Sequence, residues 1–390
     1  MRRRPRLSSA ALGLRASVFA TLADKIRHPP AGFLPLHIGD TCLPPPEAAR
    51  LDRLDWSRAP NPYPYSHPAG LPELLEHLAG RLAEVWGFQG MVPERLQITC
   101  GATHALSCAA RTVLNPGDEV LILAPFWPLI PGVLSSAGLV AVQVPFSDRL
   151  YADPGCSVAD LLAPYLSART AALYFASPNN PDGKVLSRGQ VEALAEFALR
   201  HDLWVFSDEV YQDYVYDGRS HLSIASLPDM AERTLAVFSF SKSYGLAGAR
   251  VGYVAGPADV MGHLRRVANH SVYNVSAAMQ YVALQALRHG QAFLEEARRT
   301  YLEARRLLVE GLAGARFPLP EGGAYLWLEL DSEEAAWELV DRALQQGLAL
   351  APGEAFGRDY KHCLRLCFTA APPAEVARAA AILRPLLGLG

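Results

Sequence analysis

The chain has 390 residues, and 36 lysines and arginines against 39 aspartates and glutamates give it a net charge of −3 at pH 7. Half of the residues are hydrophobic and 19% are charged, an ordinary composition for a folded protein that is long enough for two domains. This balance argues against a nucleic-acid-binding protein and a disordered chain, and no stretch approaches the ~20 uncharged apolar residues of a membrane helix.

The cysteines and the N-terminus indicate the compartment. The cysteines form no CxxC pair, and their spacing suits neither a zinc site nor a disulfide framework. The basic N-terminus precedes a moderately apolar segment, but Arg15 interrupts that segment and no small-residue cleavage site follows. We therefore expect reduced thiols, no bound metal and a cytoplasmic location. The cysteines are Cys42, Cys100, Cys108, Cys156, Cys363 and Cys367.

Short apolar runs alternate with helical patterns between about residues 97 and 256. Helical stretches separate several of these runs, for example 187–201, where Leu194, Phe197 and Ala198 fall on one face. Near-continuous apolar strands separated by helices predict a large α/β domain with a mainly parallel sheet, covered by helices on both faces. The expected strands are 119–124, 140–145, 170–176, 203–207, 234–240 and 250–256.

The rest of the chain has a different pattern. Residues 275–314 are rich in Ala, Leu, Glu and Arg and are predicted to be strongly helical. Two further apolar runs follow at 324–330 and 364–368, with helices expected at 333–346 and 373–387. This mixture predicts a smaller α+β domain, which also takes in the N-terminal arm.

Several polar motifs directly follow expected strands. CGATHAL at 100–106 joins an apolar run to a helix, whose first N–H groups and dipole favour a phosphate. SPNNPDGKV at 177–185 is a proline-rich turn, and on its own it is as well explained by a plain Asn-Pro turn. SDEVYQDY at 207–214 places Asp208 at a strand end, where a helix cap is the simpler interpretation.

Residues 239–252 read SFSKSYGLAGARVG and carry the strongest signal in the chain. Lys242 follows a strand, so it lies at the edge where open α/β sheets bind ligands. A lysine amine in an apolar pocket loses its proton more easily and can form a Schiff base with a carbonyl. A surface lysine beside a glycine turn is the alternative interpretation. The run resembles the lysine signature of class I/II aminotransferases, a family of fold type I pyridoxal phosphate enzymes.

The resemblance covers roughly residues 15–385 and implies pyridoxal 5′-phosphate as the cofactor. It implies a large domain at 49–285, with a mainly parallel seven-stranded sheet between helices, and a smaller C-terminal domain at 286–390. Residues 1–48 would form an N-terminal arm and part of the small domain.

The resemblance also implies the roles of the residues around the cofactor ring. Lys242 would hold the aldehyde as a Schiff base and later move the substrate α-proton. Asp208 would keep the pyridine nitrogen protonated, while Tyr211 and Asn180 would hydrogen-bond the phenolic oxygen. Trp127, in APFWPLI at 124–130, would stack on the ring.

Phosphate and substrate contacts follow from the same resemblance. The phosphate cradle would comprise Gly101, Ala102 and Thr103, mostly through backbone amides, together with Ser239 and Arg250. Arg365, in LRLCF at 364–368, and Gly39, in LHIGD at 36–40, would bind the substrate α-carboxylate, which Asn180 would also approach. A structural salt bridge is the alternative for Arg365.

A further motif, NPYPYSHPAGLPEL at 61–74, resembles the family stretch whose tyrosine reaches the phosphate of a neighbouring subunit. Tyr65 matches that tyrosine and Gly70 the glycine that follows it. A site shared in this way implies a C2 homodimer. Two other candidates are weaker: Glu209 is expected to point away from the cofactor by strand alternation, and His104 is expected to be a packing residue.

Two departures from the family pattern bear on the substrate. The sequence that begins at Gly39 reads GDTCLPPP, where relatives often have G-x-P. In addition, no arginine lies between Asn269 and Ser276. Relatives specific for dicarboxylates place a second carboxylate clamp there, so aspartate and glutamate are less favoured donors. We expect an aminotransferase acting between an L-amino acid and a 2-oxo acid. The alternatives are a lyase or cyclase with the same site, or a non-catalytic regulator.

Overall fold

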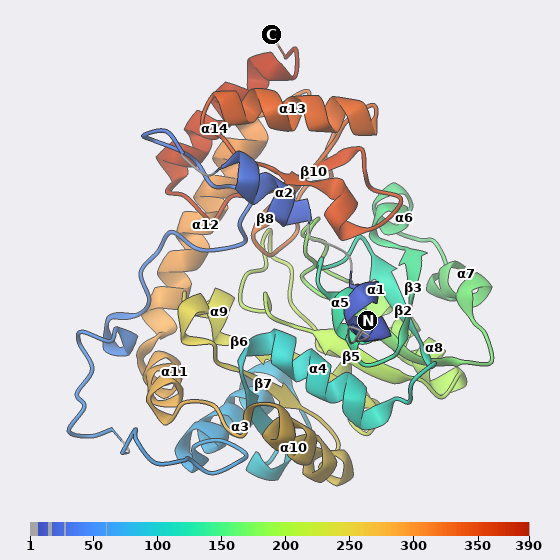
Figure 1. Cartoon of the computed structure of the whole chain (residues 1–390), viewed down its shortest axis with the longest axis vertical. Coiled ribbons are helices and arrows are strands. Elements are labelled where there is room, and N and C mark those ends of the chain that lie inside the picture. The colour runs from blue at the N-terminus through green and yellow to red at the C-terminus, as the bar shows by residue number, and fades with distance from the viewer. Residues whose placement is uncertain (1–6, 15–17, 27–28, 60, 390) are drawn as a thin grey trace, which may run out of the picture.

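A computed structural model describes residues 7–14, 18–26, 29–59 and 61–389. Parts of the expected N-terminal arm, including the basic residues 1–6 and Arg15, lie outside these ranges. Two sheets organise the molecule along its long axis, the larger in the lower part and the smaller in the upper part of the view (Figure 1).

The larger sheet has seven strands in the order β1-β7-β6-β5-β4-β2-β3. Strand β7 runs antiparallel to both of its neighbours, and all other pairs are parallel. The prediction of a mainly parallel seven-stranded sheet is therefore confirmed. The strands are β1 (Leu96–Thr99), β2 (Glu119–Ala124), β3 (Val140–Pro145), β4 (Thr170–Ala176), β5 (Trp204–Asp208), β6 (Thr234–Ser239) and β7 (Gly252–Ala255).

Helices cover both faces of this sheet, which explains the unbroken apolar runs of its strands. Strand β2 is buried throughout: Val120 and Ile122 pack on one face, and Leu121 and Leu123 on the other. The first face carries α4 (Gly101–Val113), α5 (Ile130–Ser136) and α10 (Ala258–Val272). The second carries α6 (Ser147–Ala152), α7 (Val158–Leu162) and α8 (Arg188–Arg200), where Ser187 and Gln190 form a capping box.

The predicted helical region 275–314 consists of two helices, α11 (Ala277–His289) and α12 (Gln291–Gly311), separated at Gly290. A Cβ atom on Gly290 would lie 2.3 Å from the Ala286 carbonyl and 2.6 Å from the Tyr244 ring. The backbone therefore approaches its neighbours too closely for a side chain here. With α3 (Pro72–Trp86), α11 covers the β1, β7 and β6 end of the sheet.

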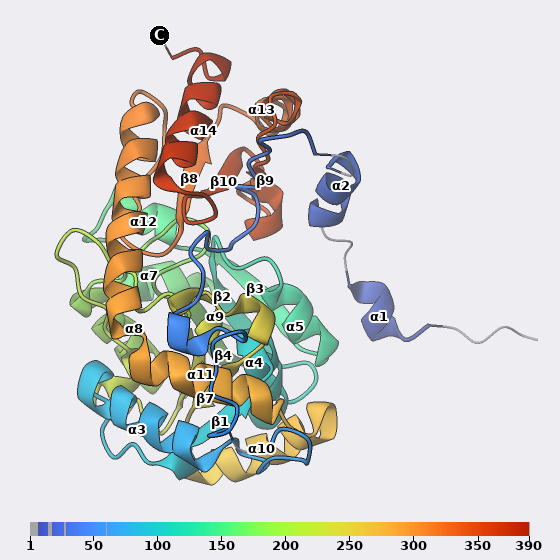
Figure 2. The same ribbon diagram turned by 90° about the vertical axis from the view of Figure 1, so that its left-hand side faces the viewer.

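The smaller sheet is antiparallel, in the order β8-β10-β9. Helix α12 runs from beside the large sheet to this smaller one (Figure 2). The boundaries at 48/49 and 285/286 remain predictions. The elements are β8 (Tyr325–Glu329), β9 (Ala351–Pro352), β10 (Cys363–Cys367), α13 (Glu333–Gln345) and α14 (Pro373–Leu386).

The N-terminal helices lie along one side of the molecule (Figure 2). Helix α1 (Ser9–Gly13) contacts α5, whereas α2 (Val18–Lys25) reaches α13 through an ion pair between Lys25 and Asp341. No helix in the described parts of the chain is long and apolar enough to cross a lipid bilayer. All six cysteines are free thiols.

Candidate active site

The polar strand ends converge at one edge of the large sheet. Strands β2, β4, β5 and β6 are parallel, so their carboxyl ends meet there. A cavity of about 170 Å³ opens at this edge. Its lining includes most of the predicted cofactor residues: Ala102, Thr103, Trp127, Asn180, Asp208, Tyr211, Ser239, Lys242 and Arg250.

Lys242 lies in α9 (Phe240–Ser243), a single turn that directly follows β6. The hydroxyl of Ser239 caps this turn by accepting a hydrogen bond from the Ser241 N–H at 3.0 Å. The ammonium of Lys242 donates to the carbonyl of Gly39, which places the predicted substrate glycine directly at the lysine. Burial lowers the pKa of Lys242 from its ordinary value, so the neutral, nucleophilic amine is easier to reach.

Asp208 is the last residue of β5 and is buried. Its Oδ2 accepts a hydrogen bond of 3.0 Å from the hydroxyl of Tyr174 on the neighbouring strand β4. Burial raises the pKa of Asp208 to about 6. Its described hydrogen-bond partners, the Tyr174 hydroxyl and the Val210 N–H, are neutral and do not offset this cost. A protonated ring nitrogen would supply the missing positive charge. The sequence analysis missed Tyr174, whose only signal is a tyrosine within an apolar strand.

An anion cradle forms where the start of α4 meets Arg250. A Cβ atom on Gly101 would lie 2.6 Å from Arg250 Nη2, so the guanidinium packs directly over the glycine. A Cβ atom on Gly252 would lie 2.9 Å from the Ala102 nitrogen, so β7 also approaches the helix start closely. The first N–H groups of a helix and an adjacent guanidinium together suit a phosphate.

Tyr211 extends its hydroxyl to within 2.5 Å of the Tyr325 hydroxyl on β8. Either group can donate, so Tyr211 keeps its own proton for a further acceptor when Tyr325 is the donor. Tyr325 was also missed from the sequence, although it touches three predicted residues. Its hydroxyl lies where a Cβ atom on Gly39 would be, and its ring is 4.3 Å from the Arg365 guanidinium.

Arg365 is buried on β10 and meets Asn180 from the large domain. Its Nη1 donates to Asn180 Oδ1 at 2.9 Å, and its Nη2 donates to the His37 carbonyl at 2.7 Å. Its Nε has no hydrogen-bond partner among the described residues, and no described carboxylate pairs with it. A buried, unpaired guanidinium N–H is costly, and a substrate carboxylate would satisfy it. The geometry therefore gives no support to the salt-bridge alternative.

Tyr65 and Gly70 lie away from the cavity of their own chain. The side chain of Tyr65 is 79% exposed and packs against Tyr273, with ring centroids 4.5 Å apart and the ring planes tilted by 57°. Gly70 ends the same loop, where its N–H donates to the His67 carbonyl at 2.9 Å.

The two weaker candidates also lie outside the cavity. Glu209 accepts hydrogen bonds from His221 at 2.8 Å and Ser223 at 2.6 Å, within a buried cluster. His104 Nδ1 accepts from the Cys100 N–H at 3.1 Å, and its Nε2 contacts the Ser271 hydroxyl at 2.7 Å. Both side chains are therefore held by hydrogen bonds to residues outside the cavity.

The cavity therefore fits pyridoxal phosphate in each of its chemical demands. It combines a lysine of lowered pKa, a buried carboxylate that lacks a cation, an anion cradle and an aromatic side chain, Trp127. Together with the seven-stranded sheet, it defines a fold type I pyridoxal phosphate enzyme.

Comparison with known proteins supplies the family. Residues 31–383 match the family described as aminotransferase class I and II. The chain is 35% identical to the arginine–pyruvate transaminase of Pseudomonas aeruginosa over 340 residues, which are 86% of this chain and 85% of the relative. The chain belongs to the class I and II aminotransferase family and is a pyridoxal phosphate-dependent aminotransferase.

Solved structures agree with this assignment. The Thermus thermophilus aspartate aminotransferase with maleate superimposes with a TM-score of 0.86 at 30% identity, covering 98% of this chain and all of the other. The N-succinyldiaminopimelate aminotransferase of Mycobacterium tuberculosis gives a TM-score of 0.87 at 27% identity, with the same coverage. The predicted fold type I architecture is confirmed.

Proposed function

We propose that this aminotransferase moves an amino group from an L-amino acid to a 2-oxo acid at the cavity around Lys242. The observation that carries this proposal is that Lys242, Asp208 and Asn180 line one cavity, with Arg365 hydrogen-bonded to Asn180. The bound cofactor supplies an aldehyde for the amino group and a ring that stabilises the negative charge left when the α-proton is removed.

Lys242 is the proposed covalent anchor of the cofactor and the carrier of the α-proton. Its lowered pKa favours a neutral amine, which can accept a proton as a general base. The Gly39 carbonyl, which accepts from Nζ, orients the amine toward the cavity. The same amine can then return the proton as a general acid.

Asp208 and Tyr211 are proposed to control the ring. Asp208 would hold a proton on the ring nitrogen, and the hydrogen bond from Tyr174 favours the ionised carboxylate that this task needs. Tyr211 and Asn180 would donate to the phenolic oxygen, while Trp127 would stack on the ring.

The two acidic groups of the ligands are assigned to separate cradles. Gly101, Ala102, Thr103, Ser239 and Arg250 are proposed to bind the cofactor phosphate. Arg365, with Asn180 and Gly39, is proposed to bind the substrate α-carboxylate through the unpaired Nε. This division orients the Cα–H bond of the substrate toward Lys242.

We further propose a homodimer with shared active sites. Tyr65 and Tyr273 form an exposed aromatic pair, and Tyr63, two residues before Tyr65, is 93% exposed. Large aromatic side chains in this state are typical of a protein interface. A second copy of the chain would bury them and would place Tyr65 at the neighbour's phosphate.

The donor is proposed to be an amino acid whose side chain is not a carboxylate. Residues 269–276 contain neither arginine nor lysine, and Tyr273 within them is 58% exposed. An aromatic side chain at this position, in place of a cationic one, suits an apolar or cationic substrate side chain better than an anionic one. The similarity to an arginine–pyruvate transaminase agrees with this choice. We place the enzyme in amino acid metabolism or biosynthesis, in the cytoplasm.

A single-turnover absorbance experiment tests the proposal. The cofactor-loaded protein is mixed with L-arginine, L-ornithine, L-phenylalanine or L-aspartate without any oxo acid. We expect at least one non-acidic donor to convert the visible band into a stable pyridoxamine phosphate band. A visible band that returns while ammonia, water or a thiol is released would instead establish elimination or cyclisation. A response to L-aspartate alone would contradict the proposed donor class.

A further inference from the structure

Ser243, the residue after Lys242, is held from two sides by the segment that follows Asp208. Its hydroxyl donates to Asp213 Oδ2 at 2.6 Å, and its carbonyl accepts from the Tyr214 hydroxyl at 2.7 Å. All three side chains are buried. The strand end that carries Asp208 and the turn that carries Lys242 are therefore tied together behind the cavity.

Arg81 balances the charge of Asp213, and Arg298 holds its backbone carbonyl. Arg81 of α3 donates to Asp213 Oδ1 at 2.6 Å, which makes a largely buried ion pair. Arg298 of α12 donates to the Asp213 carbonyl at 3.0 Å and 3.3 Å. A carboxylate that is both paired and hydrogen-bonded holds a fixed position, and the bonds that it accepts are stronger than neutral ones.

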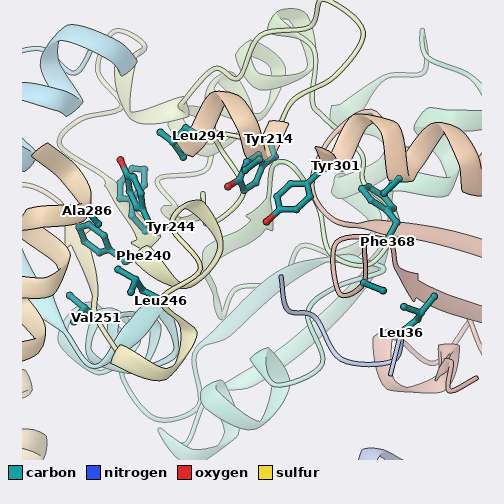
Figure 3. Close-up of a cluster of buried hydrophobic side chains, with 14 of the residues drawn as sticks. Leu36, Tyr214, Phe240, Tyr244, Leu246, Val251, Ala286, Leu294, Tyr301 and Phe368 are labelled. Carbon is teal, nitrogen blue, oxygen red and sulfur yellow. The ribbon is translucent and has the colours of Figure 1, made fainter. Parts of the chain in front are cut away.

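A second contact fixes the amine end of the lysine. The Tyr214 ring meets the Tyr301 ring edge-on, with centroids 5.0 Å apart, and the two lie side by side in Figure 3. The hydroxyl of Tyr301 bonds to Thr41, two residues after the glycine whose carbonyl accepts from Lys242. Tyr214 therefore contacts the turn that carries the Lys242 backbone, and Tyr301 contacts the segment that accepts from the Lys242 amine.

We propose that Asp213, neutralised by Arg81, is a positioning residue that aims Lys242 at the cofactor aldehyde. Asp213 does not line the cavity, so it acts through Ser243 and the turn. This inference rests on the proposed role of Lys242 as covalent anchor. Small displacements of a reacting group lower reactivity steeply, so loosening the turn affects the ligand that must bond to Lys242.

Comparing the affinities for two forms of the cofactor distinguishes a role in positioning Lys242 from a role in supporting the fold. Pyridoxal phosphate uses both the cradle and Lys242, whereas pyridoxamine phosphate uses the cradle but has no aldehyde to bond to the lysine. Affinities of both forms are measured by absorbance and fluorescence titration of apoprotein prepared from the wild type, Asp213→Asn and the milder Ser243→Ala. Reduction with borohydride followed by peptide mapping reports the covalent adduct on Lys242.

The matched control is Glu119→Gln. Glu119 is also a buried carboxylate that accepts from a serine and an arginine, Ser167 at 2.5 Å and Arg169 at 2.6 Å. It opens β2, at the end of the strand opposite the cavity. Arg169 is 69% exposed, so this variant reports the cost of losing a buried carboxylate with serine and arginine partners at a distance from Lys242.

We expect Asp213→Asn and Ser243→Ala to bind pyridoxal phosphate about tenfold more weakly, the equivalent of one lost hydrogen bond. Their affinity for pyridoxamine phosphate should stay within about twofold of wild type, and Glu119→Gln should change neither affinity. Equal weakening of both forms would overturn the positioning role and leave Asp213 as a support of the fold. A wild-type protein without a borohydride-trapped adduct on Lys242 would overturn the proposed function itself.

Discussion

The hydroxyl of Tyr174 donates to Asp208 Oδ2 across two neighbouring strands, at 3.0 Å. This neutral donor is a weak partner for a buried carboxylate, and the pKa of Asp208 accordingly rises to about 6, mainly because of burial. The cofactor-free site therefore holds a group whose charge is costly until a cation binds. Such a conflict between stability and binding is expected where a residue serves a ligand rather than the fold.

The first prediction concerns how the destabilising effect of ionised Asp208 on the folded protein depends on pH. A pKa of about 6 in the folded state, against 3.8 ordinarily, means that Asp208 favours folding when protonated. Its contribution is complete below pH about 4 and is lost as the pH rises through about 6. Asp208→Asn should thus stabilise the cofactor-free protein at pH 7.5 by up to about 3 kcal/mol, and by little at pH 4.

Urea unfolding of the cofactor-free proteins at the two pH values measures this difference. Asp182, whose pKa is also raised by burial to about 6, titrates in both proteins and cancels in the comparison. Asp331→Asn, at an exposed position, is the control and should leave stability unchanged at both pH values. The same Asp208→Asn protein should bind pyridoxal phosphate more weakly than wild type. A stability gain that is independent of pH would contradict the assigned cause.

The second prediction concerns Lys242. Lys242→Ala should lose the visible absorbance band of the bound cofactor and reduce turnover by at least about 10³-fold, because anchor and proton carrier are removed together. Spectra and steady-state rates measure both effects. Lys361→Ala, which breaks only a surface pair with Glu333, is the control and should retain full activity. Full activity in Lys242→Ala would refute the assignment of the site.

The third prediction concerns the substrate carboxylate. Arg365→Gln should lower kcat/KM about 100-fold, mainly through KM, because charge-assisted bonds to the carboxylate are lost. Arg365→Lys should recover only part of this loss, since a lysine lacks the planar fork. Steady-state kinetics and cofactor titration separate substrate binding from cofactor binding. An unchanged KM for the amino donor would remove Arg365 from the substrate site.

The sequence was sufficient for the architecture and for much of the cavity lining, because both depend on local patterns. Apolar runs reveal buried strands, and polar residues directly after those runs, such as Asp208 and Lys242, must reach the same edge of a parallel sheet. The contacts of Tyr174 and Tyr325 depend on strand pairing and on the docking of the second sheet. Strand pairing and sheet docking are determined by segments that are distant in the sequence, so no local pattern predicts these contacts.

The fourth prediction concerns the shared active site. Tyr65 does not reach the cavity of its own chain, so the proposed dimer requires it in the neighbour's site. Tyr65→Phe should weaken phosphate binding, and Lys242→Ala should be inactive. In a mixed dimer of Tyr65→Phe and Lys242→Ala chains, the one site with an intact Lys242 borrows its tyrosine from the Lys242→Ala chain, so that site is complete.

The mixed dimers are formed by reversible dissociation and isolated with a different affinity tag on each chain. They should bind pyridoxal phosphate at their competent site more tightly than the Tyr65→Phe dimer does. The double variant, Tyr65→Phe with Lys242→Ala in one chain, mixed with wild type is the matched control. Its mixed dimers, isolated in the same way from the wild-type dimers, contain one intact lysine site that faces a phenylalanine, so they should behave like Tyr65→Phe. Weaker binding by the first mixed dimer than by the control mixed dimer would place Tyr65 in its own subunit's site, and equal affinities would place it in neither site. A monomer by sedimentation would reject the shared site altogether.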